Sequence, residues 1–151
     1  PTEFWVGAKY YQGTRSPNNA EREDIGYSSA WLHHKGRNKH HYEYWIDYSM
    51  QALPGGMAPV PMPDKYIAEM IMDRIAASKV YMGGEYTDRS PLDYYYQGTD
   101  RAPIHPETKA KLLYVLEMLA EEGEEKTFRF IKEELVQHKR CMDWHQLEKA
   151  E

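Results

Sequence analysis

The chain has 151 residues, a length that suits one domain built around one hydrophobic core. Its formal net charge of −5, without a long basic run, argues against nucleic acid as the main partner. The single cysteine, Cys141, excludes an intrachain disulfide and fits a cytoplasmic location, and no apolar run approaches the roughly 18 residues of a transmembrane helix.

The first third of the chain predicts two helices. The first is expected over residues 3–11, where aromatic and apolar side chains fall on one face. A second, longer helix is expected over residues 21–48, with a break near Gly26 and a restart capped by Ser28 or Ser29. Gly36 within it either permits the close approach of another helix or a ligand, or marks a local break in the histidine segment. This second helix would carry most of the histidines of the chain.

Four of the seven histidines fall between positions 33 and 41. Seven residues are nearly two helical turns, so a continuous helix would align His33 with His40 and His34 with His41. Neutral imidazole is the commonest protein ligand for metals, and the stripe therefore predicts a metal site. The helix rise between His33 and His40 is about 10.5 Å, so a shared ion would need ligands from other helices. Solvated histidines on an exposed helix are the alternative.

Residues 53–63 contain four prolines and two glycines, and this composition predicts a linker without regular structure. A strong helix is expected over residues 65–82, with Asp64 as its cap or first-turn residue. Glu69 and Asp73 lie four residues apart in it and would direct both carboxylates to one place. The alternative for these two acids is an ordinary surface face paired with neighbouring basic residues.

The rest of the chain also predicts helices. A short one is expected over residues 92–97, with three consecutive tyrosines, and longer ones over 105–122 and 124–138. A weak terminal helix is expected over residues 143–150. No segment predicts a strand, so the predicted fold class is all-α.

Several kinds of chemistry are excluded by missing motifs. The sequence has no His-Glu-x-x-His, no Cys-x-x-Cys, no phosphate-binding loop and no dinucleotide fingerprint. What remains is a set of histidines and carboxylates on helices. This donor set suits a divalent transition metal such as zinc, iron, manganese or nickel.

Five short motifs together resemble an uncharacterised family of small bacterial and phage helical proteins. They are Trp31-Leu-His33, Asn38-Lys-His40-His41, Tyr44-Trp45, Glu69-Met-x-x-Asp73 and His105-Pro-Glu-Thr108. The whole pattern is similar to HD-domain metal-dependent phosphohydrolases, which are helical bundles that bind one or two metal ions through histidines and aspartates.

The resemblance implies a set of site residues. The metal ligands would be His33, His40 or His41, and Asp73. The implied activity is hydrolysis of a phosphate ester on a small, nucleotide-like molecule, with metal-activated water. Glu69 would orient a ligand or act as the general base. The substrate-binding residues would be Arg37, as a phosphate contact, and Asn38.

Further expectations follow from the same comparison. Residues 1–151 would form a single helical domain that lacks the upstream His and His-Asp ligands of the HD-like pattern, so a preceding segment or a second copy of the chain would complete the site. The histidine helix would pack against the 65–82 helix, with Asp73 facing the histidines. Two alternatives from other classes are a di-iron oxygenase on the same scaffold and a non-catalytic helical binding module.

Overall fold

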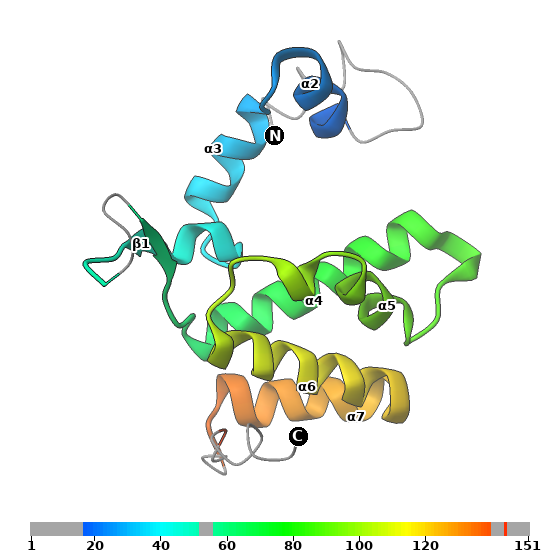
Figure 1. The fold of residues 1–151 in the computed structure, drawn as a ribbon. Coiled ribbons are helices and arrows are strands. Elements are labelled where there is room, and N and C mark those ends of the chain that lie inside the picture. The colour runs from blue at the N-terminus through cyan, green and yellow to red at the C-terminus, as the bar shows by residue number, and fades with distance from the viewer. Residues whose placement is uncertain (1–16, 52–55, 140–143, 145–151) are drawn as a thin grey trace. The chain divides into compact units, whose positions relative to one another are not determined.

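The computed structural model describes residues 17–51, 56–139 and 144, which divide between two compact units, 1–39 and 40–151. The described chain is mostly helical, as expected for an all-α protein, with one small sheet (Figure 1). No helix in these ranges has both the length and the apolar character needed to cross a membrane. The helices predicted over 3–11 and 143–150 lie outside the described residues, except for Trp144.

The first unit contains the helices α2 (Pro17–Ile25) and α3 (Ser29–Arg37). Gly26 follows α2 with a φ of +87°, a left-handed conformation that favours glycine and ends helices. The hydroxyl of Ser28 then accepts a hydrogen bond from the Trp31 backbone N–H at 3.2 Å. The predicted break and the predicted serine cap are both confirmed.

The second helix ends eleven residues earlier than the sequence predicted, at Arg37 rather than at Tyr48. Asn38 has an extended backbone, with a φ of −116°, and its side-chain amide donates to the backbone carbonyl of His34 at 2.8 Å. The backbone N–H of Asn38 also donates to this carbonyl, at 3.1 Å, so the backbone and the side chain of Asn38 together close the end of the helix. His40 and His41 therefore lie beyond the helix, and the prediction of one continuous histidine stripe is wrong.

The second unit begins with a 3₁₀ turn and a β-hairpin, where the sequence predicted helix and linker. The turn η1 (Tyr42–Trp45) leads into β1 (Ile46–Tyr48), which pairs antiparallel with β2 (Met57–Pro59). Pro59 can belong to a strand here because it stands at the end of a two-stranded sheet, where a missing N–H costs little. The backbone N–H of Val60 extends the pairing with a 2.8 Å bond to the carbonyl of Trp45.

The long helix α4 (Asp64–Met82) forms the centre of the second unit and confirms the predicted 65–82 helix. Gly83 ends it in a left-handed conformation, with a φ of +53°. The helix buries one apolar stripe against α5 (Ser90–Tyr96), α6 (Pro106–Glu122) and the helical end of the described chain. The buried core of the second unit comprises Met62, Ile67, Ala68, Met70, Ile71, Ile75, Leu92, Tyr95, Leu112, Val115, Leu116, Leu119, Ile131 and Leu135.

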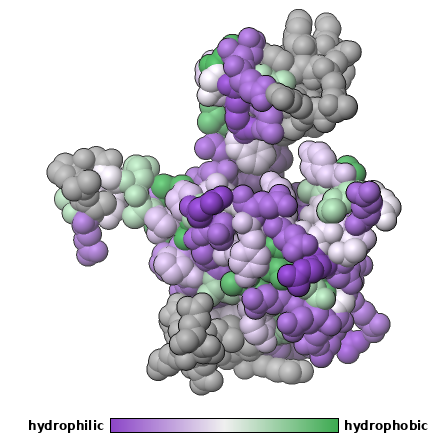
Figure 2. All heavy atoms as spheres, turned by 45° about the vertical axis from the view of Figure 1, so that its right-hand side comes forward, coloured by the Kyte–Doolittle hydropathy of each residue, from purple (hydrophilic) through white to green (hydrophobic). Residues whose placement is uncertain are grey.

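The short 3₁₀ turns η2 (Gly83–Glu85) and η3 (Thr99–Arg101) flank α5. The helix α7 (Glu124–Phe130) runs back along α6 and continues as a π-helical turn, η4 (Ile131–Val136) (Figure 1). Together these two elements confirm the helix predicted over 124–138. The surface drawn in Figure 2 is mainly hydrophilic, and hydrophobic residues appear on it as small, separate patches.

A fully paired charge cluster joins α4 to α6. The Lys111 ammonium, in a side chain only 8% exposed, lies 2.7 Å from Asp64 Oδ1 and 3.3 Å from Glu107 Oε1. The second oxygen of Asp64 lies 3.6 Å from Nδ1 of His138, a residue with a left-handed backbone. The indole ring of Trp144 also faces the ammonium, with its centroid 5.3 Å away. Because Lys111 has carboxylates beside it, its burial does not leave a charge uncompensated.

Candidate functional site

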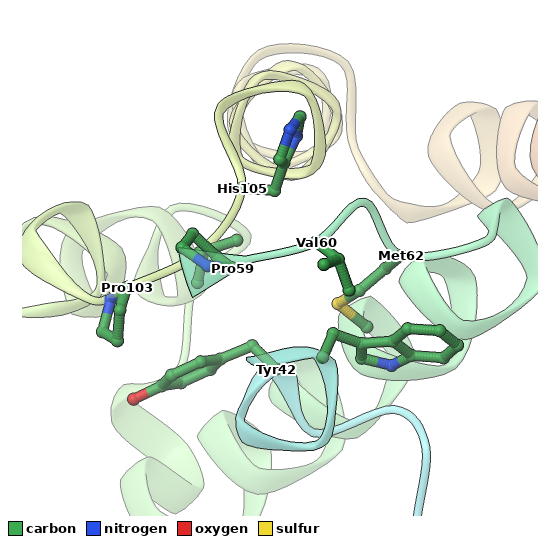
Figure 3. Close-up of a pocket in the computed structure, with 8 residues that line it drawn as sticks. Tyr42, Pro59, Val60, Met62, Pro103 and His105 are labelled. Carbon is green, nitrogen blue, oxygen red and sulfur yellow. The ribbon is translucent and has the colours of Figure 1, made fainter. Parts of the chain in front are cut away.

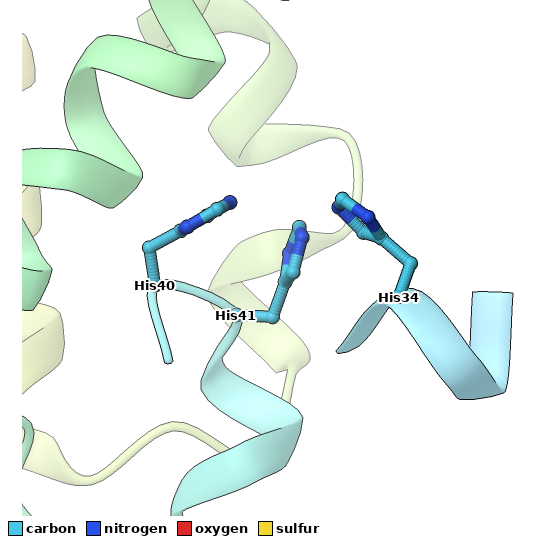
Figure 4. A group of neighbouring side chains, drawn as sticks. All are labelled: His34, His40 and His41. Atoms are coloured by element: carbon cyan, nitrogen blue, oxygen red, sulfur yellow. The ribbon is translucent and has the colours of Figure 1, made fainter. Parts of the chain in front are cut away.

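Two adjacent histidines open the second unit, directly before η1. Figure 4 shows that His40 and His41 project from this extended stretch of chain, whereas His34 comes from α3. The imidazole rings of His40 and His41 have centroids 4.3 Å apart, and each ring offers a nitrogen within 4.8 Å of the other's. The pair therefore presents two potential metal ligands side by side, without needing a helical spacing.

A carboxylate from α4 lies next to this histidine pair. Oε2 of Glu69 is 3.9 Å from Nδ1 of His40, and the histidine side chain is 18% exposed. Ligands that share a tetrahedral metal with bonds of 2.0–2.1 Å are about 3.3 Å apart. The observed 3.9 Å separation between Glu69 and His40 is thus slightly longer than the distance between two ligand atoms on one metal ion.

Aromatic packing holds η1 along α4 and keeps the histidines near Glu69. The rings of Trp45 and Tyr66 have centroids 5.6 Å apart, which anchors the end of η1 near the start of α4. At the other end of η1, Tyr42 lies within electrostatic range of Arg74, two turns further along α4. Tyr42, Trp45 and Tyr66 are all partly buried against the core of the second unit, so the segment after the histidines is anchored at both ends.

The model of a family of unknown function (DUF5662) matches residues 1–118. The chain belongs to this family. No curated protein and no solved structure matches the chain. The match to DUF5662 includes the histidine pair, all of α4 and most of α6, and it ends before α7. Every residue of the candidate site therefore lies within the family region.

The structure brings together only some of the residues predicted from the sequence. His40, His41 and Glu69 are neighbours in the second unit. Asp73 lies exposed on α4, one turn beyond Glu69, as its spacing predicted. Its predicted role as a metal ligand stays a prediction, as does the HD-like arrangement.

The other predicted site residues belong to the first unit. His33 and Arg37 lie on α3, and the amide of Asn38 closes the end of that helix. The prediction that a helix over residues 33–41 packs against α4 is wrong, because no helix spans those positions. Metal binding by His33 and substrate binding by Arg37 and Asn38 stay predictions.

Sequence reasoning missed a polar cluster around Arg74. The Nη1 group of Arg74 donates to the Thr99 hydroxyl at 3.1 Å, while the buried Nε has no hydrogen-bond partner. Burial lowers the pKa of Arg74, and the side chains of Tyr94, Tyr42, Glu43 and Asp73 act in the opposite direction. One oxygen of Glu43 is also buried without a hydrogen-bond partner. Burial raises the pKa of Tyr42, and the Glu43 carboxylate adds to that rise.

A crevice opens on another side of η1. It is lined by Tyr42, Trp45, Pro59, Val60, Met62, Pro103, Ile104 and His105 (Figure 3). His105 begins α6, where its Nδ1 accepts a hydrogen bond from the Glu107 backbone N–H at 3.2 Å. With its imidazole engaged as a helix cap and mostly apolar neighbours, this crevice offers less chemistry than the histidine pair.

Proposed function

We propose that the chain binds a divalent transition metal through His40, His41 and Glu69 and hydrolyses a phosphate ester there. The observation that carries the proposal is the 3.9 Å approach of the Glu69 carboxylate to one of two neighbouring imidazoles, whose ring centroids are 4.3 Å apart. Two imidazoles and one carboxylate form the ligand set of many catalytic zinc sites. It also suits iron, manganese and nickel.

Small side-chain movements would complete the coordination. The His40–Glu69 separation would shorten from 3.9 Å to about 3.3 Å, and the two imidazole nitrogens, now within 4.8 Å, would approach similarly. Glu69 has the freedom to move because its side chain is 58% exposed. Coordination positions left by these three ligands would be filled by water and by a phosphate oxygen.

Such a metal would supply the chemistry that the side chains lack. A bound divalent ion lowers the pKa of coordinated water and neutralises charge on phosphate oxygens. Asp73 lies one helical turn from Glu69, and in this proposal it would accept a proton from that water. In this proposal Glu69 is a ligand and Asp73 the base, which reverses the roles predicted from the sequence.

The experiment is a titration of the 151-residue chain with Co²⁺ and Zn²⁺, followed by optical spectroscopy and calorimetry. His40→Gln, His41→Gln and Glu69→Gln should each weaken the affinity at least tenfold, because each would remove a ligand. His138→Gln is the matched control, since this histidine lies beside the Lys111 cluster instead. Release of phosphate from p-nitrophenyl phosphate and from a panel of nucleotides should require the metal and decrease in the same three variants.

Two outcomes would overturn the proposal. One is metal affinity that stays the same in all three site variants and in the control. The other is stoichiometric metal binding at this site without hydrolysis of any phosphate ester in the panel, which would leave a metal-binding module in place of an enzyme.

A further inference from the structure

Arg74 is a partly buried cation of the second unit, and the carboxylates of Glu43 and Asp73 act on it only through space, without an ion pair. Within residues 17–51, 56–139 and 144, no carboxylate lies within 4.0 Å of its guanidinium, and its only hydrogen bond is from Nη1 to Thr99. The Nε atom is buried and makes no hydrogen bond. Leaving a buried donor unsatisfied costs free energy, more so when the group is charged.

A carboxylate beside Arg74 has the complementary deficit. Glu43 is close enough to influence Arg74 and Tyr42 electrostatically, yet Oε2 of Glu43 is buried without a hydrogen-bond donor. The cluster thus contains an unsatisfied donor and an unsatisfied acceptor that do not bond to each other. A ligand that satisfies both must present an acceptor to Arg74 and a donor to Glu43.

Two tyrosines supply further hydroxyl groups around the same place. Tyr42 is half-buried on η1, and Tyr94 on α5 is 60% exposed; both act electrostatically on Arg74. Side chains from η1 and α5 therefore act on one guanidinium of α4.

We propose that Arg74, Tyr42, Tyr94 and Glu43 form a binding site for a phosphate group that carries a proton. Arg74 Nε and the tyrosine hydroxyls donate to the phosphate oxygens, as guanidinium groups commonly do. The P–OH group of the phosphate donates to Oε2 of Glu43. Sulfate has the same shape but no proton at neutral pH, so the Glu43 carboxylate repels it.

This inference deepens the proposed function, because it assigns a place to the anionic part of the substrate, but the phosphate site does not need the metal. The test is therefore calorimetric titration of the full chain with inorganic phosphate and with sulfate, in the presence of a chelator. We expect saturable phosphate binding and sulfate binding at least tenfold weaker. Failure of the metal site alone leaves this result unchanged, so the two proposals fail separately.

Four variants locate the binding. Arg74→Gln should weaken phosphate binding tenfold or more, whereas the exposed Arg101→Gln should leave it unchanged. Glu43→Gln should reduce the preference for phosphate over sulfate, because the amide can donate to either anion. Tyr94→Phe should weaken phosphate binding a few-fold, and this substitution on an exposed ring does not endanger the fold.

Circular dichroism establishes that each variant is folded. If Arg74→Gln unfolds, Arg74→Lys replaces it, because lysine keeps the positive charge. Arg74→Lys should bind phosphate more weakly than the natural chain, since lysine lacks the forked donors of arginine. Equal affinity for phosphate and sulfate in the natural chain would overturn the proposal. So would undiminished phosphate binding in the Arg74 variant, or no phosphate binding at all.

Discussion

Lys111 and Arg74 are two cations within one helical unit, and their surroundings differ in the number of acids within reach. Lys111 has two carboxylates within 3.3 Å and an indole ring over its ammonium. Arg74 has one neutral hydroxyl at 3.1 Å and an Nε atom without a partner. Lys111 is buried and Arg74 is partly buried, so the paired cation is the more deeply placed of the two.

The difference separates a charge that stabilises the fold from a charge that is available to a ligand. A buried ion pair whose partners satisfy each other contributes little net stability, but losing one partner is costly. A guanidinium whose buried Nε makes no hydrogen bond already incurs part of that cost in the free protein. The candidate phosphate site rests on this contrast, which substitutions at both positions can test.

The largest expected effect on stability is at Lys111, the cation that is paired with carboxylates. Lys111→Ala should lower the free energy of unfolding by about 3 kcal/mol, because Asp64 and Glu107 would then share a region of low exposure without their cation. Urea denaturation followed by circular dichroism measures this change. Lys126→Ala, which removes an exposed pair with Glu122, should cost less than about 1 kcal/mol. Equal losses in the two variants would contradict the structural role of Lys111.

Giving Arg74 an acid should make it resemble Lys111. Thr99→Asp replaces the hydroxyl that Arg74 contacts with a carboxylate of similar size. We expect the free energy of unfolding to rise by about 1–2 kcal/mol, since hydrogen bonds between charged groups are stronger than neutral ones. Phosphate affinity should fall at least tenfold in the same variant, because the new acid occupies the guanidinium. Unchanged phosphate binding would show that the anion binds elsewhere.

Tyr86 shows how an acid that is already present affects a neighbouring group. Burial first, and then the Glu124 carboxylate, raise the pKa of Tyr86 to about 12. The unfolded chain loses this proton near pH 10 and the folded chain near pH 12, so stability is full below pH 10 and declines between these values. Tyr86→Phe should reduce this pH-dependent loss of unfolding free energy by about 1 kcal/mol or less, because solvent screens the partly exposed group. Unfolding curves at pH 8, 10 and 11.5 measure it, and identical slopes would contradict the shift.

The smallest effect is expected at Arg74, whose hydrogen-bond partner is a neutral hydroxyl rather than a carboxylate. Arg74→Met should change the free energy of unfolding by less than about 1 kcal/mol, because the lost Thr99 bond is offset by relief of an unpaired buried charge. Thermal and urea unfolding of the variant beside Lys111→Ala provides the comparison. A loss as large as that of Lys111→Ala would mean that Arg74 stabilises the fold and is not held for a ligand.

The sequence predicted those elements of the fold whose ends carry strong local signals. Glycine after α4 and after α6, and proline at the start of α6, placed these long helices almost to the residue. The hairpin was missed because its strands have three residues each and one of them contains Pro59. Such short strands are fixed by pairing with each other, which a single segment of sequence does not reveal.

Prediction of the candidate site depended on where a helix ends. Histidines spaced seven apart indicated one helical face, but the Gly36-Arg37-Asn38 segment ends α3 before His40. That segment was the available signal, since a glycine and an asparagine together favour a helix terminus. Glu69 was identified by its residue type and its spacing on α4. Arg74 and Glu43 were missed because an unsatisfied buried atom is a property of three-dimensional packing alone.

The hairpin also determines where residues can be inserted into the chain without displacing the candidate site. It returns the chain from η1 to the start of α4, and its register, Ile46 opposite Pro59, sets how far the histidine segment extends along that helix. A slip of one residue would displace η1 by about 3.3 Å and exchange the two faces of each strand. Related chains should therefore vary freely in length between the two strands. Insertions between the histidine pair and β1, or between β2 and α4, should be rare among them.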